Sequence, residues 1–269
     1  MAQDAIQKRL ADAVAAGDRR SLEAAVLDNR HHGRPGVNGA TKRLLAGLLI
    51  ARDGKGSPAL YETAIDLSES PVQDLRSVSA VLLADLWPED RDGVFERGLT
   101  LAQDDEWEVR EWAAGIFGTA LDRDFEAEYA AMLELTAHAS DRVRRAVVLA
   151  AMQAAGAKRP ERAAPLLALL EPLLPDAAEC VRKNLGPFAI GDKMLGQYPE
   201  TTLGRLEAWA AREDVWTRWN VAMAATSANA GRHSRRLAPL LERLADDERS
   251  PVRSAVRAGL RNLARRAPR

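Results

Sequence analysis

Two residues of different chemical character stand one helical turn apart, at Trp107 and Glu111. Residues four apart lie on one face of a helix, so the indole and the carboxylate face the same space. A carboxylate stabilises positive charge that develops on a sugar, and it orients a water molecule. An indole face holds a cation with about 0.5–2 kcal/mol. The pair therefore predicts chemistry on a positively charged group.

Cations and a second aromatic occupy the equivalent positions of later segments. The residue after a recurring arginine is Glu111 in one segment, then Arg145, Lys183 and Trp219 in the next three. If the segments stack in register, these side chains form one line across the protein. Arginine and lysine on such a line are suited to holding phosphate groups.

The recurring arginine marks a sequence repeat, and this repeat predicts the elements that position the side chains. In each copy the arginine stands at the head of an Ala-rich apolar stretch. Successive marker arginines are 34, 34, 38, 36 and 35 residues apart, a period that fits two helices and two turns. The marker arginines are Arg76, Arg110, Arg144, Arg182, Arg218 and Arg253.

One unit shows the pattern in detail. Apolar side chains recur at helical spacing over 123–137, which predicts a first helix. Ser140 or Asp141 is placed to cap a second helix over 142–154. Such a unit cannot bury its apolar face alone, so neighbouring units stack on one another.

We therefore predict an all-α fold, a right-handed-type α-solenoid of HEAT-like helical-hairpin repeats. It forms a single domain over 1–269, with atypical units over 1–70 and clear repeats over 71–266. A long loop over 29–41 separates the atypical units, and loops of this length are often functional.

Charge is distributed unevenly, although the formal net charge is −1. Residues 85–134 hold fifteen Asp and Glu against four Arg, whereas residues 249–269 hold seven Arg and no acid. Residues 29–52 also contain bases and no acid. This asymmetry is typical of a basic binding face with an acidic back, and ordinary solvated helix surfaces are the alternative.

The last helix carries an arginine every fourth residue: Arg253, Arg257, Arg261 and Arg265. Like charges at this spacing slightly destabilise a helix, so the stripe predicts an anionic partner such as a phosphate backbone. A polar cap on the last repeat explains the stripe equally well.

Several classes of protein are not expected. No run of eighteen apolar residues predicts a membrane span, and the first ten residues hold no apolar signal core. Cys180 stands alone, which excludes a disulfide within the chain and favours a cytoplasmic location. His31, His32, His138 and His233 lack metal-ligand spacing, so we expect neither metal nor cofactor.

Over about 75–261, the sequence resembles the HEAT-like-repeat DNA glycosylases of bacterial alkylation repair, the AlkC/AlkD-like proteins. The resemblance is most specific at Trp107-Glu108-Val109-Arg110-Glu111 and at the pair Arg144-Arg145. It implies that Trp107 and Glu111 are catalytic and that Arg145 clamps a phosphate. The family's later aromatic falls nearest Lys183 or Phe188, and neither is a tryptophan.

The resemblance also implies a function: recognition of alkylation damage in double-stranded DNA, by a monomer without cofactor that lies at the bacterial nucleoid when bound. The family releases cationic alkylpurines such as 3-methyladenine and 7-methylguanine. An alkylated purine leaves as a neutral base, so its glycosidic bond is already weak, and a carboxylate beside the sugar suffices. Arg145, Lys183, Trp219, Arg144, Arg182, Arg218, Arg253 and Arg257 are the expected DNA contacts.

Other interpretations stay open. A lesion-binding relative without glycosylase activity fits the same residues, and bulky adducts fit an open groove as well as methyl groups do. A protein-binding HEAT scaffold is the main alternative, and a chaperone-like lyase for a cofactor-bearing partner is a third. Among single residues, Trp112 is expected to be half-buried packing, Glu111 can pair with Arg144 or Arg145, and the marker arginines can hold turns.

Overall fold

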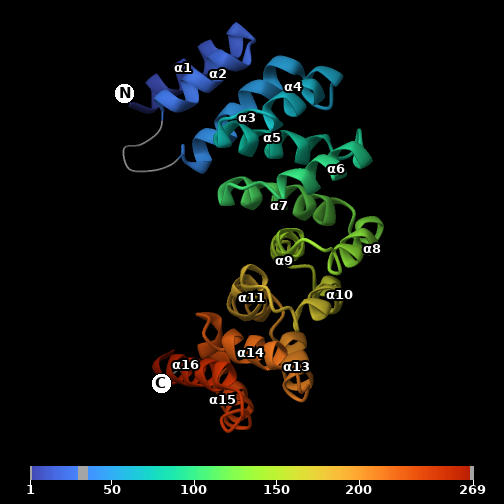
Figure 1. The fold of residues 1–269 in the computed structure, drawn as a ribbon, viewed down its shortest axis with the longest axis vertical. Helices are drawn as coiled ribbons and strands as arrows, with labels where there is room; N and C mark the ends of the chain where they lie inside the picture. Colours follow the sequence, from blue (N-terminus) through green and yellow to red (C-terminus); the bar gives the residue numbers. More distant parts are fainter. Residues whose placement is uncertain (1, 30–35, 267–269) are drawn as a thin grey trace. The chain divides into compact units, whose positions relative to one another are not determined.

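The structure is a computed structural model that describes residues 2–29 and 36–266 (Figure 1). The described residues form helices joined by turns, and no strand occurs among them, so the predicted all-α fold is confirmed. Residues 30–35 of the predicted loop over 29–41 lie outside the described residues, and the last part of the loop differs from the prediction because α3 already begins at Gly39.

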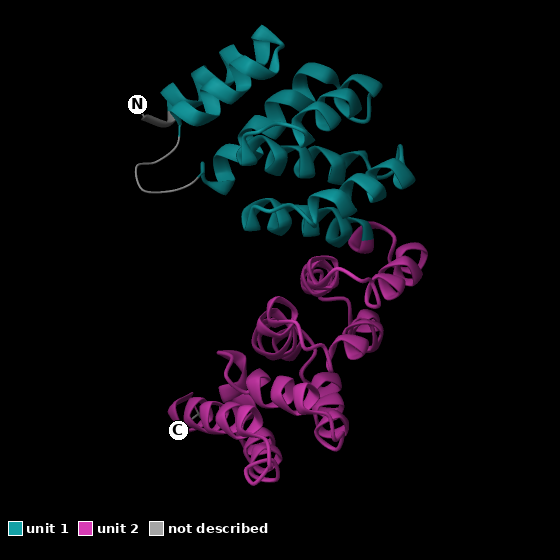
Figure 2. Cartoon of the chain, viewed as in Figure 1, with its two compact units in different colours: residues 1–120 teal, residues 121–269 magenta. Residues whose placement is uncertain are grey.

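The chain divides into two compact units, residues 1–120 and 121–269 (Figure 2). Each unit is described by itself. How the units join into the single domain expected over 1–269 stays a prediction.

Unit 1 is a set of helical hairpins whose apolar sides face one another. Its core includes the fully buried side chains of Leu45, Leu60, Leu75, Leu82 and Phe117. Asn38 and Ser57 cap α3 and α4 through their side chains, which fixes where those helices begin. The helices are α1 (Ala2–Ala16), α2 (Arg19–Asp28), α3 (Gly39–Asp53), α4 (Pro58–Ser68), α5 (Gln73–Leu86), α6 (Arg91–Leu101) and α7 (Trp107–Arg123), whose last turn passes into unit 2.

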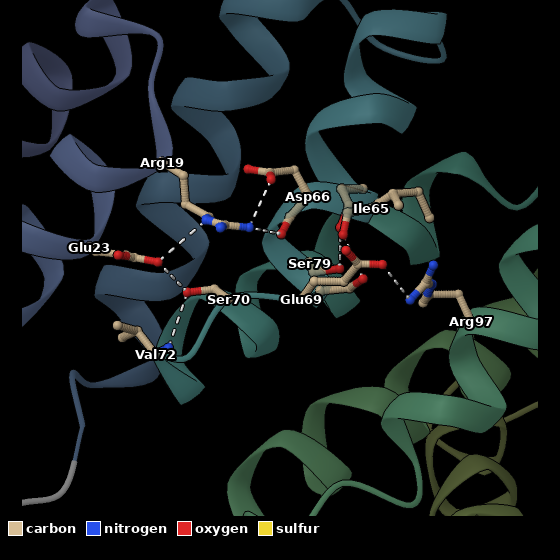
Figure 3. A network of polar contacts seen from close by, with 11 residues as sticks. Arg19, Glu23, Ile65, Asp66, Glu69, Ser70, Val72, Ser79 and Arg97 are labelled. Atoms are coloured by element: carbon tan, nitrogen blue, oxygen red, sulfur yellow. Dashed lines mark hydrogen bonds and ion pairs between the residues drawn. The ribbon is translucent and has the colours of Figure 1, made fainter.

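Polar contacts tie the start of α2 to the end of α4 (Figure 3). Arg19 donates to the Asp66 carboxylate at 2.9 Å. Ser70 donates to Glu23 at 2.9 Å and accepts from the backbone N–H of Val72 at 3.1 Å. These bonds fix the turn from which α5 begins.

Unit 2 continues the hairpin pattern, with α9 and α11 on one side and α8 and α10 on the other (Figure 1). The helix predicted to begin at about residue 161 is not one continuous α-helix. Short 3-10 turns at Pro160–Arg162 and Glu171–Leu173 flank a shorter α-helix, α10. The helices are α8 (Phe125–Leu135), α9 (Asp141–Ala155), α10 (Ala163–Leu170), α11 (Glu179–Asn184), the π-helix η3 (Leu185–Met194), α12 (Leu195–Gln197), α13 (Pro199–Ala210), α14 (Val215–Ala224), the 3-10 turn η4 (Asn229–His233), α15 (Ser234–Glu242) and α16 (Ser250–Arg266).

The π-helix η3 packs unusually close to α14. A Cβ on Gly186 would lie 2.9 Å from Asn220 Oδ1, and one on Gly191 would lie 2.8 Å from the Cα atom of Ala224. Ser227 donates to the carbonyl oxygen of Gly191 at 2.7 Å across the same contact. Only glycine permits this approach, so the backbones of η3 and α14 pack in direct contact.

The marker arginines hold the turns that precede their helices. Five of them donate to the carbonyl oxygen six residues earlier: Arg76 to Ser70, Arg110 to Asp104, Arg144 to His138, Arg218 to Arg212 and Arg253 to Asp247. Three also bind a carboxylate of the next repeat, at 2.6–2.8 Å: Arg76 with Asp104, Arg144 with Asp176 and Arg218 with Asp247. This arrangement explains why arginine recurs with the period of the repeat.

Candidate functional site

The start of α7 presents the tryptophan and the carboxylate to solvent. Trp107 is the first residue of α7, and its side chain is 60% exposed. Glu111 lies one turn further along the same helix and is also exposed. The predicted placement of both residues at the start of a helix, one turn apart, is confirmed. An indole and a carboxylate are therefore both exposed to solvent near the start of α7.

Trp112 faces the other way and packs half-buried against α3. The guanidinium carbon of Arg43 lies 5.1 Å from its ring centroid and Lys42 Nζ lies 5.7 Å from it. A Cβ on Gly39 would lie 3.3 Å from the same indole. The prediction that Trp112 is packing rather than part of an open site is confirmed.

A buried charge cluster lies beneath this packing. Lys42 of α3 is fully buried and its Nζ lies 3.2 Å from Asp74 of α5 and 2.5 Å from Glu108 of α7. These are ion-pair distances, and no described residue offers Lys42 Nζ an acceptor in hydrogen-bond geometry. The backbone N–H of Val37 donates to Asp74 at 3.1 Å and helps to balance its charge. The cluster joins the starts of α3, α5 and α7, and Glu108 stands next to Trp107.

Sequence reasoning missed Lys42, although a signal was present. Lys42 precedes Arg76 by 34 residues, the same spacing that separates the first three marker arginines. It also stands three residues after the first residue of its helix, as Arg76 does in α5. A search for arginine alone overlooks a lysine in the marker position.

In unit 2, Arg182 of α11 and two tryptophans of α14 form a stacked cluster. The Arg182 guanidinium carbon lies 3.7 Å from the Trp216 ring centroid and 5.2 Å from that of Trp219. The two rings are 6.4 Å apart and meet edge to face at 78°. All three side chains are partly exposed. Two predicted DNA contacts, Arg182 and Trp219, are thus brought together, and Trp216 joins them.

The other predicted contacts of unit 2 lie near the heads of α9 and α11. Lys183 is exposed and pairs with Glu179 at 2.7 Å. Arg145 is half-buried, and its positive charge is close enough to Cys180 to act on the pKa of that thiol. Phe188 lies on η3 with its side chain 55% exposed. Cations and an exposed aromatic therefore accompany the stacked cluster.

Three predicted contacts serve the turns as well. Arg144, Arg218 and Arg253 donate to turn carbonyl groups, and the first two also pair with aspartates of the next repeat. Each of them thus holds its own turn, which favours an architectural role for them.

The arginine stripe of α16 presents a different environment. Arg257, Arg261 and Arg265 are exposed, and no carboxylate among the described residues pairs with them. Arg261 and Arg265 line a shallow pocket together with Thr226, Ala258, Asn262 and Ala264. This surface of unit 2 is suited to an anion.

The predicted line of side chains is divided between the units. Trp107 and Glu111 belong to unit 1, whereas Arg145, Lys183 and Trp219 belong to unit 2. A continuous line therefore stays a prediction. Within the described residues, no helix is long and apolar enough to cross a membrane, and no group of three or more His, Cys, Asp or Glu is arranged to hold a metal ion.

Comparison with solved structures identifies the fold. The crystal structure of smu.31 from Streptococcus mutans UA159 matches with a TM-score of 0.57 and 17% identity, covering 66% of this chain and 89% of that one. The fold is that of a helical repeat protein. A designed armadillo repeat protein in complex with the peptide (KR)4 matches with a TM-score of 0.35 and 19% identity, over 76% of this chain and 99% of that one.

No family model and no curated protein matches the chain. At 17% identity, the likeness to smu.31 concerns the fold alone. The resemblance to the alkylation-repair family therefore stays a prediction.

Proposed function

We propose that this protein binds double-stranded DNA and acts on cationic alkylpurines, as a DNA glycosylase or as a lesion-binding relative. The observation that carries the proposal is the exposed pair Trp107 and Glu111 at the start of α7. A tryptophan that is 60% exposed on an ordered helix is unusual, because large aromatic side chains are mostly buried. Its partner, a carboxylate one turn away, suits a ligand with positive charge.

The chemistry follows from the lesion. In an N3- or N7-alkylated purine, the bond between C1′ and the base breaks with its electron pair going to the base, which leaves neutral. The sugar takes on oxocarbenium character, and Glu111 stabilises that charge. Water adds to C1′ and its proton passes to the carboxylate or to solvent. Trp107 holds the cationic base by cation–π contact until the bond breaks.

The buried cluster beneath α7 supports this assignment. Lys42 draws Glu108 toward α3, and Glu108 is the neighbour of Trp107. The first turn of α7, which carries Trp107 and precedes Glu111, is thus held from below. A rigid support is what a site needs if it acts by positioning rather than by a cofactor.

The test uses one duplex that carries a single 7-methylguanine and an undamaged duplex of the same sequence. Base release and equilibrium binding are measured for the wild type, Glu111→Gln and Trp107→Ala. Glu106→Gln is the matched control, because it removes an exposed acid from the turn just before α7. We expect Glu111→Gln to lose about 100-fold in the rate of release while binding is kept. Trp107→Ala should lose about 2- to 30-fold in preference for the cationic lesion.

Each other outcome has a definite meaning. DNA binding without release in the wild type identifies a lesion-binding relative, and a duplex with a bulkier adduct is then the next substrate. Equal release by Glu111→Gln and the wild type removes Glu111 from the chemistry. Absence of DNA binding at low salt rejects the proposal and leaves the protein-binding scaffold.

A further inference from the structure

Arg182 occupies a marker position but lies in a different environment from three other marker arginines. Arg76, Arg144 and Arg218 each pair with an aspartate of the following repeat. No carboxylate among the described residues pairs with Arg182. Its guanidinium is therefore not used to join its repeat to the next by an ion pair.

The sequence explains the difference. The residue six before the next marker arginine is aspartate at Asp104, Asp176 and Asp247, the three partners named above. Six residues before Arg218 the sequence has Arg212 instead. After Arg182 this position therefore holds a like charge instead of a carboxylate, and Arg212 itself pairs with Glu171. Electrostatic repulsion disfavours the usual position, and Arg182 turns toward the tryptophans of α14.

Stacking on these tryptophans leaves the edge of the guanidinium open. Trp216 covers one face at 3.7 Å from its ring centroid, and Trp219 lies 5.2 Å away. Of the five N–H donors of arginine, only the one on Nε has an acceptor among the described residues, the carbonyl oxygen of Ala177 at 3.2 Å. The four N–H groups on Nη1 and Nη2 are thus available in a plane that two indoles fix.

We propose that Arg182, held by Trp216 and Trp219, is a preformed site for one phosphodiester group of nucleic acid. The planar fork of arginine matches two phosphate oxygens, and stacking removes the rotamer freedom that binding otherwise costs. The neighbouring Lys183 adds a second cation, and its ammonium group pairs with the Glu179 carboxylate. This inference rests on the proposed DNA function, but it assigns Arg182 a role distinct from those of the turn-holding marker arginines.

The first experiment measures binding of undamaged duplex DNA against salt concentration. Arg182→Gln should reduce the slope of log K against log salt by about 0.9, the value for one phosphate contact, and weaken binding about ten-fold. Arg182→Lys keeps the charge and loses the fork, so it should keep the slope and lose part of the affinity. Arg236→Gln is the matched control, because Arg236 is an exposed arginine of unit 2 that already pairs with Glu200 and Glu207.

The second experiment reports on the site without DNA. Dimethyl phosphate is titrated into the full chain, and the indole N–H resonances of Trp216 and Trp219 are followed by NMR, with Trp216→Phe and Trp219→Phe giving the assignments. Both resonances should shift in the wild type and stay in place in Arg182→Gln. Neutral trimethyl phosphate should shift neither.

The two readouts separate the proposals. If the wild type binds duplex DNA but Arg182→Gln keeps its slope and affinity, the phosphodiester site is rejected and the DNA function stands. If the wild type binds no DNA while dimethyl phosphate still shifts the indoles through Arg182, the anion site stands and the duplex function is rejected. Unshifted indoles in the wild type reject the site.

Discussion

Lys42 Nζ lies 2.5 Å from Glu108 Oε1, and the lysine side chain is fully buried. The same nitrogen lies 3.2 Å from Asp74, which is also fully buried. Removal of one partner from a buried ion pair leaves an uncompensated charge in the interior, and this costs more than the loss of the pair itself.

Lys42→Met is therefore expected to lower the free energy of unfolding by about 3–5 kcal/mol, measured by urea denaturation. Lys55→Met is the control, because Lys55 is 70% exposed and its pair with Asp85 is a surface contact. The control should change stability by less than about 1 kcal/mol. An equal loss in free energy of unfolding for both variants would show that the buried cluster stabilises the protein no more than a surface ion pair does.

Two glycines of unit 2 should respond oppositely to the same change. Gly191→Ala puts a methyl group against the backbone of Ala224, so we expect a loss of about 1–3 kcal/mol. Gly204→Ala lies inside α13 with open space around it, so better helix propensity should stabilise by about 0.5–1 kcal/mol. Thermal and urea unfolding of both variants measure the contrast. If Gly191→Ala left the free energy of unfolding unchanged, η3 and α14 would be able to move apart at little cost.

The Asp247 carboxylate gives unit 2 a pH-dependent contribution. The Arg249 guanidinium, with Arg218 beside it, holds the pKa of Asp247 well below its ordinary value. A lowered folded-state pKa stabilises the protein above the unfolded pKa of about 3.9 and loses this effect as the pH falls toward the folded pKa.

Asp247→Asn should therefore lower the free energy of unfolding by about 2–3 kcal/mol at pH 7. The difference in free energy of unfolding between the variant and the wild type should become smaller below about pH 4. Urea unfolding from pH 7 to pH 3 measures it. Asp66→Asn is the control, because the Asp66 carboxylate is 53% exposed and its pair with Arg19 lies at the surface. A constant gap at every pH would assign the loss to packing instead.

The Cys180 thiol is expected to react slowly. Burial, together with the charge and hydrogen bond of Asp141, raises its pKa to about 11. A free cysteine has a pKa of about 8.5, so at pH 7 far less of Cys180 than of a free cysteine is present as thiolate. The thiolate of higher pKa is the better nucleophile, which offsets part of this difference. The alkylation rate of Cys180 should therefore be roughly 20-fold lower than that of a free cysteine.

Iodoacetamide labelling against pH measures that rate. Asp141→Asn should speed labelling several-fold, because it removes the charge and the acceptor while burial remains. Labelling of the wild type at the rate of a free cysteine peptide would contradict the raised pKa.

The exposed arginines of α16 predict a salt effect on DNA binding. A variant with Arg257→Gln, Arg261→Gln and Arg265→Gln should lose up to about 0.9 per residue from the salt slope. Arg235→Gln with Arg236→Gln on α15 removes charge elsewhere in unit 2 and should change the slope less. If the slope of log K against log salt falls by the same amount per residue in both variants, the stripe is a polar cap and makes no specific contact with DNA.

Much of the fold could be predicted from the marker arginines alone. Their spacing predicted hairpin units, and the observed α8 and α9 lie within two residues of the helices expected over 123–137 and 142–154. The π-helix η3 escaped prediction because apolar periodicity assumes the α-helical repeat, and the close contacts of Gly186 and Gly191 depend on a neighbour far along the chain.

The candidate site was predicted less completely. Trp107 and Glu111 depend only on local helix geometry, and their placement is confirmed. The Arg182 cluster depends on which residue the next repeat presents, and the sequence signal for it, Arg212 in place of aspartate, acquires meaning only once the Arg–Asp joints are known.

The joints of unit 2 differ in what holds them. Arg144 with Asp176 and Arg218 with Asp247 rely on carboxylates, whereas the joint from α11 to α14 relies on an arginine stacked on indoles and on glycine contacts. Acid neutralises carboxylates and leaves arginine and tryptophan unchanged. The stacked and glycine contacts between α11, η3 and α14 should therefore persist at an acidic pH at which the two arginine–aspartate pairs are lost.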